Sequence, residues 1–272
     1  MALFGSDAYS PREIAERVAE ASVAKTRLPI VSLIMLGMLA GAFIALGSLF
    51  YVVVVSDPEL GWAARRVLGG VVFSLGLLLV VVAGAELFTG NNLLAMAWAD
   101  GKVTTAEILF NWFVVCMANF AGALAVASFV FLSGHLAMND GAIGKAYLDI
   151  AAGKTSLPVW SAFFSGVMCN VLVCLAVWMA LAGRSVMDKA IAIVFPVSAF
   201  VAAGFEHSVA NMYFIPLAMM IQADAGQPLE IAGLFRNLVP VIAGNVVGGS
   251  VLVALVYYVI YRRPLRRGVD DA

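Results

Sequence analysis

Four long stretches without a charged residue limit most strongly how this chain can fold. They run over residues 28–56, 108–133, 155–183 and 237–261. Each is long enough to cross the roughly 30 Å hydrocarbon core of a bilayer as one tilted helix. The first stretch follows a charged leader and is too long for the apolar part of a signal peptide, so we expect it to stay in the mature protein. The chain is therefore predicted to be an all-α protein that crosses a membrane several times.

Two further apolar segments are too long for a single crossing. Residues 67–99 are interrupted only by Glu86, and residues 190–223 only by Glu206 and His207. A continuous helix of that length would measure roughly 50 Å. At the interruptions, AGAELFTGNN and AAGFEHSVAN both place glycine and other small residues before an acid and then polar residues. We predict that both segments break near their middle, although such small residues can also serve only to let helices pack closely.

A repeated asparagine pattern follows each of these segments. The spacing N-x7-N-x2-G occurs once in NWFVVCMANFAG and once in NLVPVIAGNVVGG. Each half of the chain thus contains a continuous span, a broken span and an asparagine-bearing span. Because a unit of three crossings reverses direction in its second copy, the halves should be inverted repeats. We predict six spans over residues 28–262, with repeats at about 28–133 and 155–262.

Composition excludes several classes of function. Hydrophobic residues make up 63% of the 272, charged residues make up 12%, and the formal net charge is −1. This balance offers no basic surface for nucleic acid, and the expected surroundings are membrane lipid. The three cysteines lie in apolar stretches without metal-ligand spacing, and a single membrane-embedded histidine excludes a bis-histidine haem. We therefore expect no metal and no cofactor.

The basic residues and the N-terminal segment set the expected orientation. In a six-span topology most of the 16 Lys and Arg fall on the side of the N-terminus, which predicts that both termini are cytoplasmic. Within residues 1–27, Ser10, Pro11 and Glu13 begin an amphipathic surface helix with a capping box. Residues 263–272 form the predicted cytoplasmic tail.

The paired ionisable groups at the second break suggest a pathway for an anion. A broken helix exposes backbone N–H groups at the start of its second half, and with the helix dipole these make a positive end. His207 titrates near neutrality and is the side chain expected to face the path, while Glu206 should hold backbone or asparagine groups. The alternative is a structural histidine bonded within the bundle. His135 lies in a loop, and we expect no role for it.

Three motifs resemble those of the formate/nitrite transporter family. They are AELFTGN, NVLVCLAVWMALAGRSVMDKA and AAGFEHSVANMYFIP, and the second is especially similar to the formate channel branch. The likeness runs over about residues 10–262. It implies an aquaporin-like protomer of six helices with the second and fifth broken, assembled as a homopentamer with a pore in each protomer. It also implies a bacterial inner membrane.

The resemblance assigns roles to named residues. His207 would stand at the pore centre facing Thr89, and Glu206 with Asn211 would fix the second break. Glu86 precedes LFT where some relatives carry Asp. Further residues would narrow the pore or draw the anion inward. They are Leu87 and Phe88 at the cytoplasmic constriction, Phe73, Leu77 and Phe200 toward the other side, and Lys154 and Asn170 as attracting groups.

The hypothesis from the sequence is a channel for small monovalent anions of weak acids, with formate first and proton exchange at His207. Nitrite, hydrosulfide or another monocarboxylate remain alternatives within the family. A water or glycerol channel would carry Asn-Pro-Ala at each break, and neither break has it. An intramembrane hydrolase using Glu206 and His207 would need a nucleophile, and Ser208 is badly placed as the next residue in sequence. We therefore predict that the protein is not an enzyme.

Overall fold

The structure is a computed structural model that describes residues 8–263. Within these residues the chain is helical throughout, and the elements lie in the following order. They are α1 (Pro11–Thr26), α2 (Ile30–Val55), α3 (Trp62–Phe73), α4 (Leu75–Leu78), η1 (Leu79–Gly84), η2 (Gly90–Leu94), α5 (Ala95–Ala99), α6 (Thr105–Leu132), η3 (His135–Ala137), α7 (Ala142–Thr155), α8 (Val159–Ala182), α9 (Val186–Ala203), α10 (Ser208–Asp224), α11 (Ile231–Val246), η4 (Val247–Leu255) and η5 (Tyr258–Arg262).

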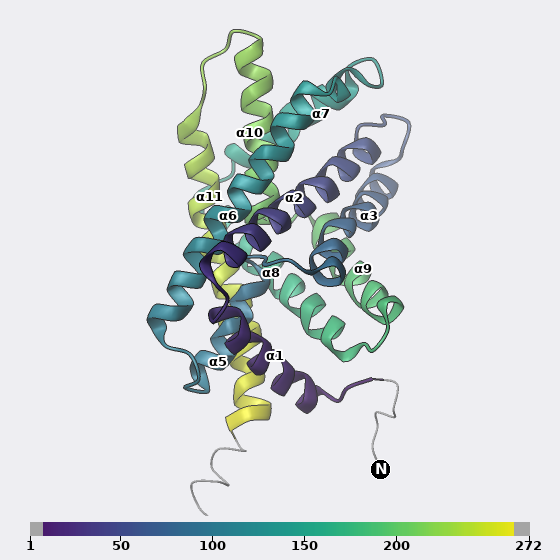
Figure 1. Cartoon of the computed structure of the whole chain (residues 1–272). Helices are drawn as coiled ribbons and strands as arrows, with labels where there is room; N and C mark the ends of the chain where they lie inside the picture. The colour runs from purple at the N-terminus through teal and green to yellow at the C-terminus, as the bar shows by residue number, and fades with distance from the viewer. Residues whose placement is uncertain (1–7, 264–272) are drawn as a thin grey trace, which may run out of the picture.

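Six helical segments of the described chain are long and apolar enough to cross a membrane. They are Ile30–Val55, Trp62–Gly84, Thr105–Leu132, Val159–Ala182, Val186–Ala203 and Ile231–Arg262. The six predicted spans are thereby confirmed, and the helices form one bundle (Figure 1). Many large apolar side chains on its outer faces stay exposed, because a membrane protein turns such residues toward lipid or neighbouring chains.

Both predicted breaks are present, and a glycine makes each of them. Gly84 has φ +87° and Gly204 has φ +81°, which is the left-handed region that glycine enters without strain. After the first break the chain continues as the short η2 and α5, whereas after the second it continues as the longer α10. The two broken spans therefore share their point of interruption but differ in the length of the second part.

Glycines let the continuous spans approach the asparagine-bearing spans closely. A Cβ at Gly122 of α6 would meet the backbone oxygen of Met38 in α2. In the other half, a Cβ at Gly248 would meet the backbone oxygen of Val167 in α8. The pairs α2–α6 and α8–α11/η4 therefore touch backbone to backbone and form the rigid part of each half.

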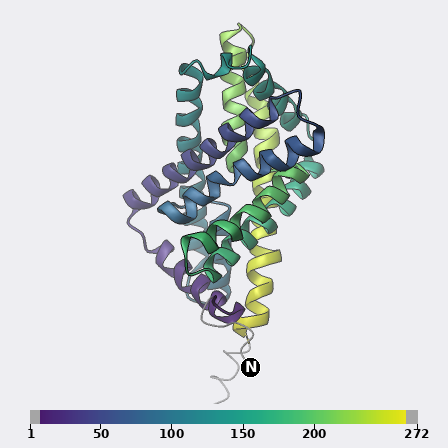
Figure 2. The same cartoon turned by 90° about the vertical axis from the view of Figure 1, so that its right-hand side faces the viewer.

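A surface helix precedes the three spans in each half, and only the first of the two was predicted from the sequence. α1 lies at the end of the molecule where the last described residues also lie, and α7 lies at the opposite end (Figures 1 and 2). The segments after them match as KTRLP and KTSLP, and Pro29 and Pro158 are the N-caps of α2 and α8. The structural unit is thus a surface helix followed by three spans. We did not predict α7, whose sequence carries little apolar periodicity.

α1 forms as its first residues predict. Ser10 accepts from the backbone N–H of Glu13, and the Glu13 carboxylate accepts from the Ser10 backbone, so the capping box is complete. Its buried face packs at the base of the bundle against α5, η2 and α8. The first seven residues and the predicted tail beyond Arg263 lie outside the described residues.

Candidate functional site

His207 lies in the extended residues between α9 and α10, where the halves of the molecule meet. Its Nδ1 accepts a hydrogen bond from the Ala210 backbone N–H at 3.1 Å, and its Nε2 lies 3.0 Å from Thr89 Oγ1. The ring stacks against Phe200 with centroids 5.9 Å apart. Glu206 and His207 lie outside both helices, because Gly204 has already ended α9.

These contacts fix the tautomer of the neutral ring. Since Nδ1 accepts from Ala210, the ring proton sits on Nε2, and Nε2–H donates to Thr89 Oγ1. The Thr89 hydroxyl is then free to turn its own hydrogen toward a ligand. The neutral pair therefore offers a hydrogen-bond donor to an anion, although neither of the two side chains carries a formal charge.

An ion pair and two asparagines hold the second break. The Glu206 carboxylate pairs with Lys154 Nζ at 2.8 Å. It also accepts from Asn211 Nδ2 at 2.7 Å and Asn237 Nδ2 at 3.2 Å. The Asn237 amide donates as well to the backbone oxygen of Lys154 at the end of α7. A buried carboxylate is stable only when paired and hydrogen-bonded in this way.

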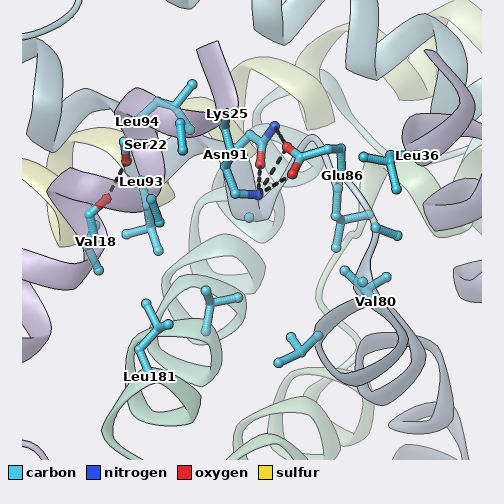
Figure 3. A pocket seen from close by; sticks show the side chains of 18 of the residues that line it. Val18, Ser22, Lys25, Leu36, Val80, Glu86, Asn91, Leu93, Leu94 and Leu181 are labelled. Carbon is cyan, nitrogen blue, oxygen red and sulfur yellow. Dashed lines mark hydrogen bonds and ion pairs between the residues drawn. The ribbon is translucent and has the colours of Figure 1, made fainter. Parts of the chain in front are cut away.

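The first break repeats this arrangement with equivalent residues (Figure 3). Glu86 pairs with Lys25 Nζ at 2.9 Å and accepts from Asn91 Nδ2 at 2.8 Å. Asn91 also donates to Asn111 Oδ1, and Asn111 donates to the backbone oxygen of Lys25 at the end of α1. Lys25 therefore corresponds to Lys154. We did not predict Lys25, although the matching KTRLP and KTSLP segments carried the signal.

One asparagine in each half ties the break to the rigid spans. Asn119 accepts from the Phe88 N–H and donates to the backbone oxygens of Glu86 and Gly37. In the second half, Asn245 accepts from the Ser208 N–H and donates to the backbone oxygens of Glu206 and Gly166. We expected free N–H groups at these positions. The asparagines satisfy them instead, because a buried N–H without a partner is costly.

The described chain contains two cavities and a small space between them, which we call the central space. The cavity beside α1, which we call the α1-side cavity, has a volume of about 630 Å³. The cavity beside α7, which we call the α7-side cavity, has about 270 Å³. Between them lies a space of about 10 Å³, lined by Ile44, Phe73, Leu77, Leu87, Val173, Val197, Phe200 and His207. Such a space holds one water molecule at most.

The predicted narrowing residues divide between the two cavities. Leu87 and Leu77 line both the α1-side cavity and the central space. Phe73 and Phe200 line both the α7-side cavity and the central space. We grouped Leu77 with the two phenylalanines, but it lies on the α1 side because the broken span runs that way and Leu77 is one turn beyond Phe73.

The structure places three other predicted residues as follows. Phe88 is buried beside the path, and its N–H is held by Asn119. Asn170 is buried and donates to the backbone oxygens of Thr89 and Asn245, so it joins the two breaks. Lys154 lines the α7-side cavity with its charge paired to Glu206.

No group of three His, Cys, Asp or Glu side chains suited to a metal ion occurs among the described residues. His135 lies in η3, away from both cavities, and partial burial lowers its pKa. Neither a metal cluster nor a second histidine therefore accompanies His207 among the described residues.

Comparison with known proteins agrees over almost the whole chain. A sequence profile of the formate/nitrite transporter family matches residues 12–259. The chain is 41% identical over 258 residues to the uncharacterized transporter YrhG of Bacillus subtilis (strain 168), with 93% of this chain and 94% of the relative aligned. It is 37% identical over 273 residues to the formate channel FocA of Escherichia coli (strain K12), with 94% and 96% aligned.

Solved structures also match the chain over most of its length. A pentameric formate channel with formate bound matches with a TM-score of 0.79 at 36% identity, covering 85% of this chain and 97% of that chain. An aquaglyceroporin from Plasmodium falciparum matches with a TM-score of 0.55 at 16% identity, covering 90% and 100%, and so shares the fold alone.

The expected aquaporin-like fold is thereby confirmed, as is the expectation of a transport protein rather than an enzyme. The chain is a multi-pass membrane protein, and the profile match and the identity to these relatives show that it belongs to the formate/nitrite transporter family.

Proposed function

We propose that the protein is a channel for small monovalent anions of weak acids, with formate as its main cargo and proton exchange at His207. The single observation that supports this most is that His207, which is bonded to Thr89, lines the small space between the two cavities of the described chain. The resemblance to formate channels and to a structure with formate bound supports the choice of cargo.

The narrow point explains why a proton should be involved. An anion that enters the apolar central space loses its water, and an ionised carboxylate left unpaired in a medium like this costs tens of kcal/mol in the limiting case. The neutral acid carries only a polar group, whose transfer costs roughly 2–7 kcal/mol. Crossing as the neutral acid is therefore the route of lower free energy.

His207 can supply the proton in a balanced step. A hydronium proton from the adjoining cavity adds to Nδ1 and releases the Ala210 bond, and Nε2–H then transfers a proton to an oxygen of the anion, leaving a neutral acid and a neutral ring protonated at Nδ1. Because the Ala210 N–H requires a bare Nδ1, loss of that proton to water and uptake of one at Nε2 restore the capping bond and the starting tautomer. The acid then crosses the central space and releases its proton to water in the other cavity.

The same chemistry sets the range of cargo. Small conjugate bases of weak acids fit, because each has a neutral form that can cross the central space. Nitrite and hydrosulfide meet this requirement too, and formate is preferred because named formate channels are among the relatives. Glycerol has no charged form for His207 to neutralise, and the likeness to an aquaglyceroporin extends to the fold alone.

The assembly and orientation follow from the exposed faces and the basic residues. Large apolar side chains such as Phe113, Phe129 and Phe195 are exposed on the spans. We propose that part of this surface joins five copies into a homopentamer, as in the structure titled a pentameric formate channel. We also propose a bacterial inner membrane with the α1 side cytoplasmic, since most Lys and Arg fall on that side.

The test is a flux measurement that follows charge and proton together. Purified protein in liposomes is given a formate gradient, and current and lumenal pH are recorded at once. Proton exchange predicts a pH change with little net current, whereas attraction of the bare anion predicts current without proton movement. His207→Phe should reduce formate uptake and remove its pH dependence, while His135→Phe, the matched control, should leave both unchanged. Uptake and pH dependence that survive His207→Phe would overturn the proposal.

A further inference from the structure

The two cavities differ in their charged lining. In the α1-side cavity, Lys25 is the cation among the described lining residues, and it is paired with Glu86. In the α7-side cavity, Lys154 is paired with Glu206 in the same way, but Arg66 is added. Among the residues that the structure describes, no carboxylate lies within ion-pair distance of Arg66. The α7-side cavity therefore has a cation that is not held in an ion pair, and it also has the carboxylate of Asp149 in its lining.

Arg66 lies across the carboxyl end of α9. Its Nε donates to the backbone oxygen of Ala202 at 2.8 Å. The backbone turn at Gly204 satisfies only earlier carbonyls of α9, with Gly204 N–H bonded to the oxygen of Val201 and Phe205 N–H to that of Phe200. A Cβ added at Gly204 would run into the Arg66 guanidinium. Arg66 thus occupies the space that is open because Gly204 has no side chain, and it donates to the backbone oxygen of Ala202, the next carbonyl of α9.

This position matters for an anion because of the helix dipole. The carboxyl end of a helix carries the equivalent of about half a negative charge. Val201, Gly204 and Phe205 at this end line the α7-side cavity, which also contains His207. Without a cation there, an anion approaching His207 from this side would meet carbonyl oxygens and the exposed carboxylate of Asp149, which lines the same cavity.

We propose that Arg66 determines anion access from the α7 side: it offsets the negative end of α9 and offers its remaining N–H groups to a small planar anion such as a carboxylate. A guanidinium suits this role because it can present two parallel N–H donors to two oxygens. Arg66 also lines a neighbouring cavity together with Tyr51, Trp62 and Arg65. Its guanidinium therefore borders both this neighbouring cavity and the α7-side cavity that contains the Lys154–Glu206 pair. The inference rests on the proposed function, because it assumes an anionic cargo.

The test uses charge removal and chemical restoration at one position. The three native cysteines are buried, so an introduced cysteine is the reactive one among the described residues. Arg66→Cys protein is labelled in detergent with either 2-aminoethyl methanethiosulfonate, which restores a cation, or methyl methanethiosulfonate, which does not. It is then reconstituted, and formate permeability is measured below saturation. Arg65→Cys is the matched control, because Arg65 lines only the outer cavity.

Arg66→Cys should lower formate permeability roughly 3- to 10-fold, as expected for loss of one charge at a helix end. The cationic label should restore most of it, and the neutral label should restore none. Arg65→Cys should change less than about twofold with either label, because Arg65 does not line the α7-side cavity. Failure of the cationic label to restore permeability, or an equal effect at Arg65, would overturn the proposal.

Two further measurements cover the cases in which Arg66→Cys does not fold or the wild-type protein does not conduct an anion. If Arg66→Cys does not yield a folded channel, Arg66→Lys and Arg66→Gln carry the same comparison: Lys should retain most of the permeability and Gln should lose it. The wild-type protein is measured with formate, nitrite and hydrosulfide in parallel. A wild type that conducts none of them contradicts the proposed function, whereas normal wild-type flux with no charge effect at position 66 contradicts only this inference.

Discussion

In the first half of the molecule Leu87 follows Glu86 at the break, whereas in the second half His207 follows Glu206. The surroundings are otherwise matched: a lysine from a surface helix, an asparagine on the acid and a second asparagine on the break. The two halves therefore share the residues that hold the break and differ in the residue at the central space. The lysine, the acid and the asparagines occur in both halves, whereas His207, the titratable side chain in the lining of the central space, occurs in one half only.

Removing the asparagines that tie the breaks should cause the largest effect and test whether the frames are equal. Asn119→Leu and Asn245→Leu each leave one backbone N–H and one backbone oxygen at the break without a partner and remove a second hydrogen bond from a helical carbonyl. Each variant should lose at least about 3 kcal/mol of stability, since one buried unsatisfied group costs about 1–3 kcal/mol. Thermal unfolding followed by circular dichroism in detergent measures this. Ser128→Ala on α6 is the control and should stay near wild type. A large loss in only one half would break the comparison.

The ion pairs should differ in their contribution, because they differ in exposure. The Lys154 side chain is 16% exposed and that of Lys25 is 31% exposed. Glu206→Gln leaves the more buried lysine unpaired and should cost about 3 kcal/mol, in the range for breaking a buried pair. Glu86→Gln should cost less than half as much, because water reaches Lys25. The double variant Glu206→Gln with Lys154→Met should recover part of the loss, and equal losses in the two single variants would contradict this reasoning.

Moving the histidine sharpens the comparison further. His207→Leu should lower formate uptake about 100-fold, the lower range for removing a proton-transfer group. Adding Leu87→His should not restore uptake, because the residue equivalent to Thr89 in the second half is Val209, which has no hydroxyl. Adding Thr89→Val and Val209→Thr as well should recover about tenfold. Vesicle uptake at fixed pH measures all three, and recovery with Leu87→His alone would show that the threonine is dispensable.

The smallest effect should distinguish the two surface helices. Hydrogen bonds from Ser10 hold the pKa of the Glu13 carboxyl below its ordinary value of 4.5, whereas α7 begins at Gly141 without a side-chain cap. Because the folded-state pKa is lowered, the cap contributes fully above about pH 4.5 and is lost as the pH falls through that lower value. Hydrogen exchange of the first turn should therefore accelerate in α1 but not in α7 between pH 5.5 and 3.5, after correction for intrinsic rates. The change should be absent in Glu13→Gln, and equal acceleration in α7 would refute it.

The sequence carried the features that depend on composition and on backbone conformation. Uncharged runs fixed the spans, and glycines beside Glu86 and Glu206 placed the breaks, since only the chain's own residues decide these. Features that depend on how a helix is rotated, or on which distant side chains pair, could not be predicted from the sequence. Leu77 lines the α1-side cavity, Phe88 and Asn170 are hydrogen-bonded outside the cavity linings, and α7 was not predicted. Lys25 was missed as well, because its partner Glu86 is distant in sequence.

The hydrogen bonds of Asn119 and Asn245 have a consequence for the proposed proton exchange. A carboxamide neither gains nor loses a proton in the physiological range. These two side chains therefore keep the same bonds whether the compartment is acidic or neutral. Under the proposed function, the two breaks stay tied to the neighbouring spans by these amides while the cargo and the His207 ring change protonation state.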